Sequence, residues 1–240
     1  NHNSSVPMYM QLANKLSEAV YQGKYGPGDK LPSENELCRR FNVSRITVRQ
    51  ALNLLIQQGM AFSVHGKGTF VKALDISHEL NKIISFGSVL QQKGLKGHTY
   101  IQSYEEDVMD DEAMKRLGGP VSSLKLIGYA DQTPVVFYCS YFPKELGGQM
   151  GGAAEEEEET GNAFSTYDLY ARLGIHQFRV DQTIRAANAD SQMAKLLNVS
   201  KGKAVMVLES QYYSMDGRPL EYKQGYYRSD IYSFHLKRQI

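Results

Sequence analysis

The stretch Leu31–Leu55, LPSENELCRRFNVSRITVRQALNLL, decides the fold of the N-terminal part of the chain. Ser33 is followed three residues later by Glu36, which is the spacing of a capping box at the start of a helix. Apolar residues then recur at one-turn spacing over residues 37–41. Asn42 tolerates left-handed backbone geometry and is a plausible stop. The segment therefore predicts a short first helix that ends near Asn42.

A second helix start follows at once. Ser44 is a second N-cap candidate, and Val43 before it can pack on Val48 as a hydrophobic staple. Apolar residues over 48–56 then form a core face that ends near Gly59. Two helices joined through about three residues predict a helix-turn-helix.

The first turns of the second helix carry the residues that would face a DNA major groove. Those expected to point outward are Arg45, Ile46, Thr47, Arg49 and Gln50. The i, i+4 spacing places the two arginines side by side, which suits bidentate contacts to guanine or contacts to phosphates. The alternative is a solvated basic face with no partner.

The segment AFSVHGKGTFV, residues 61–71, favours DNA binding over that alternative. Its apolar residues alternate around a glycine-bracketed tip, and this pattern predicts a hairpin with His65, Gly66 and Lys67 at the tip. With the helical segment YMQLANKLSEAVYQG before it, the whole predicts a winged helix-turn-helix. Lys67 and the bare glycine amides can then reach a minor groove or a phosphate backbone.

Charge is divided unevenly along the 240 residues. Residues 1–72 hold nine Lys and Arg against four acids, a net +5, whereas the remainder holds 18 against 22, a net −4. A basic small domain joined to a mildly acidic larger one indicates that the first meets a polyanion. With 42% hydrophobic residues, no long apolar run, no signal-peptide pattern and two distant cysteines, the sequence predicts no membrane span and a cytoplasmic protein.

The N-terminal motifs closely resemble the DNA-binding domain of bacterial GntR-type transcription regulators. The resemblance covers about residues 7–72 and includes the Gly-Asp-Lys-Leu-Pro-Ser-Glu segment, the Ser-Arg-x-Thr-Val-Arg-x-Ala-Leu helix and the Gly-x-Gly-Thr-Phe-Val wing. It implies double-stranded operator DNA as a partner. By position, the residues that would contact the operator are Ser33, Arg45, Thr47, Arg49 and Gly66.

The rest of the chain predicts an antiparallel sheet with two related halves, and with it an α+β protein. We expect a DNA-binding domain over 1–72, a linker over 73–78 and a second domain over 79–240. Residues 113–143 and 193–230 each follow the order helix, strand, turn with proline, strand. Chance recurrence of a common hairpin pattern is the alternative.

The second domain looks like the UTRA-type effector-binding domain of the HutC branch of these regulators, whose fold resembles chorismate lyase. The best matches are SFGSVLQQKG, STYDLYARLGI and GRPLEYKQGYYRSDIYSF. The resemblance implies a ligand cleft lined by Phe86, Gly87, Ser88, Ser165, Thr166, Glu221 and Tyr227.

The chemistry of these residues suits a polar ligand. Free amides at the start of the GSVLQQ helix can bind an anion, and Glu221 suits hydroxyl or amine groups. Alternatively, Ser88 and Ser165 only cap helices and Glu221 is solvated. Many relatives carry Arg-x-Arg where this chain has Leu126-Ile127-Gly128, so a phosphate clamp is missing. A sugar phosphate is still an alternative as the ligand, but the missing arginine pair favours a carboxylate or an uncharged metabolite.

These patterns favour a ligand-responsive transcription regulator, and a repressor rather than an activator. The alternatives are a lyase-like enzyme fused to a DNA-binding domain and an architectural nucleic-acid protein. No catalytic set, nucleotide loop or metal spacing occurs, and the glutamates of AAEEEEET indicate a solvated loop or helix end. We expect no cofactor, a homodimer that reads a pseudo-palindrome, and a place in the bacterial cytoplasm at the nucleoid.

Overall fold

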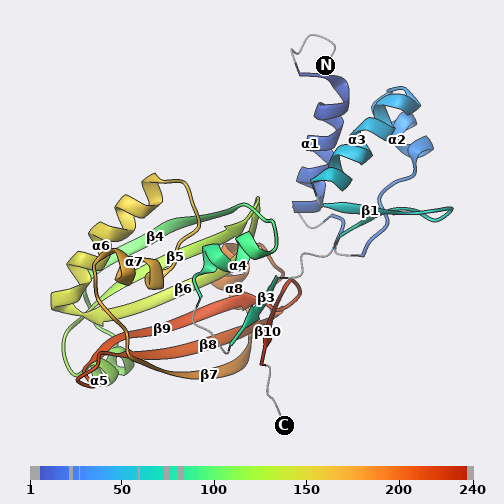
Figure 1. The fold of residues 1–240 in the computed structure, drawn as a ribbon. Coiled ribbons are helices and arrows are strands. Elements are labelled where there is room, and N and C mark those ends of the chain that lie inside the picture. Colours follow the sequence, from blue (N-terminus) through green and yellow to red (C-terminus); the bar gives the residue numbers. More distant parts are fainter. Residues whose placement is uncertain are drawn as a thin grey trace. The chain divides into compact units, whose positions relative to one another are not determined.

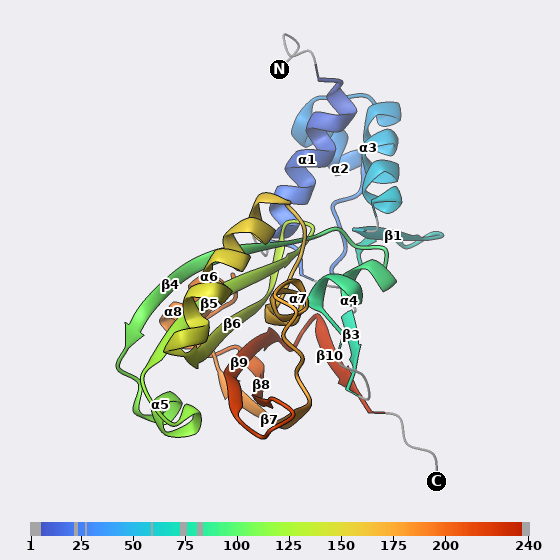
Figure 2. The ribbon, with the colours of Figure 1, turned by 60° about the vertical axis from the view of Figure 1, so that its left-hand side comes forward.

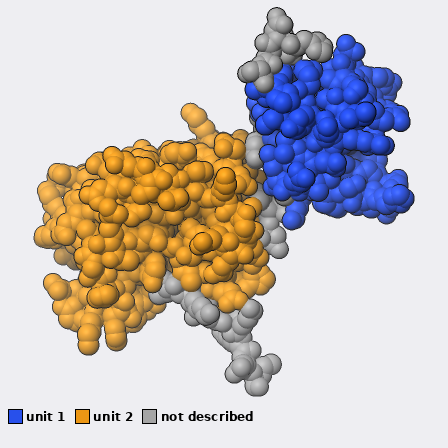
Figure 3. Space-filling model, turned by 45° about the horizontal axis from the view of Figure 1, so that its top comes forward, with its two compact units in different colours: residues 1–75 blue, residues 76–240 orange. Residues whose placement is uncertain are grey.

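The computed structural model describes residues 6–21, 24–26, 28–58, 60–72, 76–80 and 84–236. The chain divides into two compact units, residues 1–75 and 76–240 (Figure 3). The division lies within the expected linker 73–78. Residues 73–75 fall outside the described residues, whereas residues 76–78 belong to a strand of the second unit.

The first unit is a small helical domain with a two-stranded wing (Figure 1). Its elements are α1 (Met8–Tyr21), α2 (Glu34–Phe41), α3 (Arg45–Gln57), β1 (Ala61–Val64) and β2 (Gly68–Val71). Leucines of all three helices pack with Val48, Ala61 and Val71 into one core. The winged helix-turn-helix predicted from the sequence is confirmed.

Local chemistry fixes the turn between α2 and α3. The Ser33 side chain accepts a hydrogen bond from the Glu36 amide while Glu36 accepts one from the Ser33 amide, which completes the capping box. Asn42 ends α2 with a φ of 51°. Ser44 caps α3 by accepting from the Thr47 amide at 3.1 Å. Each helix boundary in the turn therefore follows from a side chain that the sequence shows.

The second unit is built on a six-stranded antiparallel sheet in the order β4-β5-β6-β9-β8-β7. The strands are β4 (Gly97–Val108), β5 (Val121–Ala130), β6 (Thr133–Pro143), β7 (Arg179–Asn188), β8 (Ala204–Tyr213) and β9 (Pro219–Arg228). Helices α5 (Asp111–Leu117) and α8 (Ser191–Leu196) precede β5 and β8. The order β4-α5-β5-β6 is thus repeated as β7-α8-β8-β9, and the predicted two related halves are present.

Helices cover both faces of this sheet, as Figures 1 and 2 show. On one face, α5 and α8 pack on alternate residues such as Ile127, Phe137 and Tyr222. On the other lie α4 (Phe86–Gln92), α6 (Lys144–Glu159) and α7 (Thr166–Arg172). The glutamate run forms the C-terminal turns of α6, so the predicted helix end is confirmed.

A separate parallel ladder joins the two ends of the second unit. β3 (Ile76–Glu79) pairs with β10 (Tyr232–His235), with Ile76 opposite Tyr232. Ile76 is fully buried. A single buried position gives no periodic pattern, and for this reason the sequence did not mark β3 as a strand.

Candidate DNA-binding surface and effector pocket

The N-terminal half of α3 presents most of its polar residues to solvent. Arg45, Ile46, Arg49 and Gln50 are exposed, and Thr47 is half-buried, with its hydroxyl 2.9 Å from the Ser44 hydroxyl. The opposite face of the helix is buried in the core. The structure therefore places the predicted base-reading residues together on one accessible surface.

Both arginines are held by α2 through contacts that the sequence did not reveal. Arg49 Nε donates to the two carboxylate oxygens of Glu34, at 3.0 and 3.1 Å. Arg45 Nη2 donates to Asn35 Oδ1 at 2.7 Å. The side chain of Arg49 is still 63% exposed. Glu34 and Asn35 thus orient the guanidinium groups without burying them.

The wing carries the second part of this surface. His65, Gly66 and Lys67 are exposed at its tip, and Gly66 has a φ of 72° that favours glycine. The rings of Phe62 and Phe70 stack across the two strands with centroids 5.7 Å apart. The tip is therefore supported by aromatic packing at its base. Ser33, the remaining residue predicted to contact DNA, is the N-cap of α2.

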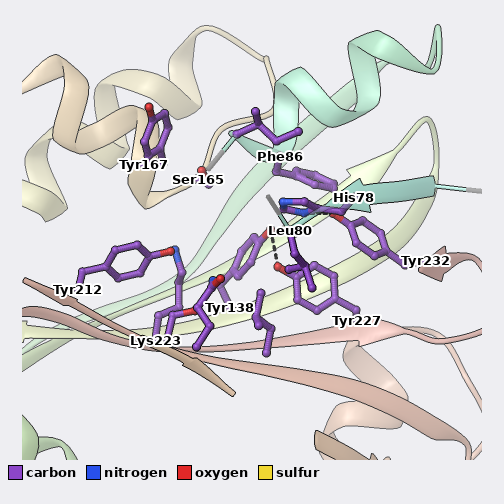
Figure 4. Close-up of a pocket in the computed structure, with 14 residues that line it drawn as sticks. His78, Leu80, Phe86, Tyr138, Ser165, Tyr167, Tyr212, Lys223, Tyr227 and Tyr232 are labelled. Atoms are coloured by element: carbon purple, nitrogen blue, oxygen red, sulfur yellow. Dashed lines mark hydrogen bonds between the residues drawn. The ribbon is translucent and has the colours of Figure 1, made fainter. Parts of the chain in front are cut away.

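A narrow pocket lies in the second unit between the sheet, β3 and the helices α4 and α7 (Figure 4). Its volume is about 50 Å³, which is space for roughly three to five water-sized groups. Side chains from eight segments line it: His78, Leu80, Ile84, Phe86, Tyr138, Ser165, Tyr167, Gln182, Leu208, Ser210, Tyr212, Lys223, Tyr227 and Tyr232. Hydroxyl, amide, imidazole and ammonium groups among them can bind a polar molecule.

Three of the seven predicted effector residues line this pocket, namely Phe86, Ser165 and Tyr227. Thr166 and Glu221 are buried beside its wall, where both contact Lys223. The pocket lining thus combines residues at the starts of α4 and α7 with residues of β9.

Gly87 and Ser88 do not line the pocket. The Ser85 side chain caps α4 by accepting from the Ser88 amide at 3.2 Å. A Cβ added at Gly87 would lie 2.5 Å from the carbonyl oxygen of Ala163, so this face of the helix start is packed against the chain. Ser165 sits at the start of α7, where its amide donates to Asp168 Oδ2 at 2.8 Å.

Tyrosines dominate the chemistry of the pocket wall. Tyr138 and Tyr227 place their hydroxyl oxygens 3.5 Å apart, and burial raises the pKa of Tyr227 to about 12. The hydroxyl oxygen of Tyr232 lies 2.9 Å from His78 Nδ1. Burial, and next the positive charge of Lys223, lower the pKa of His78. The tyrosines are therefore neutral hydrogen-bonding groups at neutral pH, and His78 is disfavoured as a cation.

The sequence reading did not find several of these residues. Gln182, Ser210 and Tyr212 come from the neighbouring strands β7 and β8, and Lys223 lies two residues from Glu221 on β9. The period of two along a strand would have placed Lys223 on the same face as Glu221. The sheet order that brings β7 and β8 beside it has no signal in the sequence.

No helix in the described ranges is long and apolar enough to cross a bilayer. Within those same ranges, no three His, Cys, Asp or Glu side chains are grouped so as to hold a metal ion.

Comparison with known proteins identifies the class. A model of the UTRA domain matches residues 92–233, and a model of bacterial regulatory proteins of the gntR family matches residues 8–71. The chain belongs to the GntR family of transcription regulators and carries a UTRA domain, in the arrangement of the HutC branch.

Relatives match over nearly their full length. The mannosyl-D-glycerate transport/metabolism system repressor MngR of Escherichia coli K12 is 29% identical over 237 residues, which are 97% of this chain and 96% of the relative. The transcriptional repressor NagR of Bacillus subtilis 168 is 27% identical, with coverage of 98% and 96%. The crystal structure of PhnF from Mycobacterium smegmatis shares the fold, with a TM-score of 0.63, 24% identity and coverage of 95% and 99%. MngR and NagR are both named as repressors, and with the gntR and UTRA matches this makes the chain a transcription regulator and not a lyase-like enzyme.

Proposed function

We propose that this protein binds operator DNA sequence-specifically and that a small polar metabolite in the UTRA domain sets its affinity for the operator. The observation that carries the proposal is the pairing, in one chain, of an exposed recognition helix with a tyrosine-lined pocket. MngR and NagR are named as repressors, which supports repression as the output.

The proposed DNA contacts lie on α2, α3 and the wing. Arg49 and Arg45 suit guanine edges because their guanidinium groups are oriented yet exposed, and Gln50 suits adenine. Lys67 suits the phosphate backbone. The full set is Ser33, Arg45, Thr47, Arg49, Gln50, His65, Gly66 and Lys67.

The proposed effector site is the pocket together with the residues around it. We keep Phe86, Gly87, Ser88, Ser165, Thr166, Glu221 and Tyr227 as its expected residues. The relative MngR takes its name from a system for mannosyl-D-glycerate, which is a hydroxylated carboxylate. Together with the absence of the arginine pair on β5, this favours a hydroxylated carboxylate over a sugar phosphate.

β3 connects the pocket to the beginning of the second unit. His78 and Leu80 line the pocket, and β3 begins at Ile76, where the second unit begins. A ligand larger than the 50 Å³ cavity has to displace part of its lining. We propose that a ligand-driven shift of β3 is what changes the affinity for operator DNA.

We further propose a homodimer formed through residues 79–240, in the bacterial cytoplasm at the nucleoid. A single helix-turn-helix reads a short half-site, so two copies are needed for a pseudo-palindrome. Strand β7 lies at an edge of the sheet, and Ile184 on it is 47% exposed.

Footprinting of the protein on fragments of its own genome tests the DNA half of this proposal. A protected pseudo-palindrome that is shared among fragments is the expected result. Uniform binding to all fragments would contradict sequence-specific recognition. Thermal shifts over a metabolite panel test the ligand half, because a ligand that binds only the folded state raises the melting temperature.

A further inference from the structure

Lys223 places a positive charge inside the effector pocket at a position that the family resemblance does not assign. The residue lies on β9 and is 8% exposed. Its Nζ donates to Thr166 Oγ1 at 2.7 Å and lies 4.8 Å from the centre of the Tyr212 ring. A buried ammonium group is costly unless nearby groups stabilise its charge. Lys223 is therefore a specific feature of this pocket.

The nearest carboxylate to Lys223, that of Glu221, makes no hydrogen bond to it. Glu221 Oε1 lies 3.7 Å from Lys223 Nζ, beyond hydrogen-bonding distance. Glu221 is fully buried, and neither of its carboxylate oxygens has a hydrogen-bond partner among the described residues. A buried ion pair without such hydrogen bonds is incompletely compensated. Lys223, which lines the pocket, can therefore gain a hydrogen bond from a ligand.

Lys223 stays charged at neutral pH. Burial alone lowers its pKa, but the Glu221 carboxylate and the oxygens of Tyr212 and Tyr227 raise it further, so the net shift is upward. His78, the other basic group in the lining, has a lowered pKa. Among the described lining residues, Lys223 is thus the cationic one.

The part of β5 that lies beside the pocket residue Tyr138 offers no cation. Leu126 and Gly128 stand there on β5, on the face that also bears Tyr138. A Cβ at Gly128 would lie 2.5 Å from Cε1 of Phe86, so the Phe86 ring fills the space beside this glycine. The Phe86 ring therefore occupies the space that a side chain at position 128 would need.

We infer that Lys223 is the anion-binding residue of the effector site and that it selects a small hydroxylated carboxylate. The inference rests on the proposed ligand response. Lys223 lines the pocket whereas Glu221 does not, so a ligand carboxylate can approach the ammonium group more closely than it approaches Glu221. The cavity of about 50 Å³ also favours a small carboxylate over a bulkier sugar phosphate. The hydroxyl and amide groups of Ser165, Ser210 and Gln182 in the lining would bind ligand hydroxyl groups.

The test compares charged and neutral probes on the full-length protein. D-glycerate is paired with glycerol, glucuronate with glucose, and glucose 6-phosphate serves as the dianionic probe. Calorimetry and thermal shifts should show that the wild type prefers each carboxylate over its neutral partner. Lys223→Met should lose that preference by at least about tenfold in affinity. Lys125→Met is the matched control, because Lys125 lies on β5 in an exposed ion pair with Glu105.

Two further variants keep the result interpretable. Lys223→Met leaves Glu221 buried without a countercharge, so the double variant Glu221→Gln/Lys223→Met provides a neutral, folded background. Lys223→Arg keeps the charge and should retain the carboxylate preference. Carboxylate binding unchanged in Lys223→Met and in the double variant would overturn the inference while leaving the proposed function intact. A wild type that binds no carboxylate probe, or binds glucose 6-phosphate best, would also overturn it, and operator binding would report separately on the regulator.

Discussion

Arg49 shows at the scale of one residue how the first helix prepares the second for DNA. Glu34 accepts from Nε of Arg49, and the two terminal nitrogens have no partner among the described residues, so they can make a bidentate contact with guanine. Arg49→Ala should therefore weaken operator binding by about 1 to 3 kcal/mol. Fluorescence anisotropy with labelled operator would measure the change. Arg218→Ala, an exposed arginine of the second unit, is the control, and equal affinities of the two variants would exclude base reading by Arg49.

Lys67 at the wing tip should behave differently from Arg49. A phosphate contact carries no sequence information, so Lys67→Ala should weaken operator and unrelated DNA alike. It should also reduce the slope of log affinity against log salt by about one. Titrations at several salt concentrations would check this, and an unchanged slope would argue against a backbone contact.

His78 makes stability depend on pH with a definite sign. Its pKa is lowered in the folded protein, whereas in the unfolded chain it stays near about 6.5. The unfolded state therefore binds more protons as the pH falls through that value, and the free energy of unfolding decreases. His78→Gln should flatten the fall in melting temperature between about pH 7.5 and pH 5.5. Exposed His176 provides the control variant, and parallel curves for wild type and His78→Gln would contradict this origin.

At the scale of the element, α4 is fixed by close backbone packing. A Cβ at Gly87 would lie 2.5 Å from a backbone carbonyl oxygen. Gly87→Ala should therefore destabilise the protein by about 1 to 3 kcal/mol. Gly152→Ala in α6 is the matched control, since nothing lies within 4 Å of its added Cβ and alanine favours the helix by about 0.5 to 1 kcal/mol. Chemical denaturation would compare them, and similar stabilities would show that α4 can move aside.

Elements that rest on local chemistry could be predicted from the sequence. The capping box at Ser33, the cap at Ser44 and the wing glycines each act within a few residues, and the structure contains all three features. The recurring helix and hairpin likewise predicted the two related halves of the sheet. β3 was not predicted, because one buried isoleucine and a parallel partner more than 150 residues away leave no local pattern.

In the candidate sites, too, local features could be predicted from the sequence and contacts between distant segments could not. The exposed residues of α3 follow from helical periodicity, whereas the ion pair between Glu34 and Arg49 depends on how α2 packs beside α3. In the pocket, the family resemblance suggested Phe86, Ser165 and Tyr227. The role of Lys223 could be recognised only from the folded sheet, because its relevant neighbours lie on other strands.

At the scale of the whole molecule, the second unit should hold two copies together. Light scattering should give about twice the mass of the 27.0 kDa chain, both free and on the operator. Substitution of the exposed Ile184 by Lys on the edge strand β7 should shift the mass toward that of one chain if β7 forms the contact. A monomer under both conditions would contradict the dimer.

The central claim is that ligand binding and operator binding are coupled, and a thermodynamic cycle tests it most directly. Operator affinity is measured with and without a ligand found by thermal shift, and ligand affinity with and without operator. The two ratios should be equal and should lie at about 5- to 150-fold, since coupling free energies are reciprocal. Tight binding of both partners with ratios of one would contradict a ligand-responsive regulator.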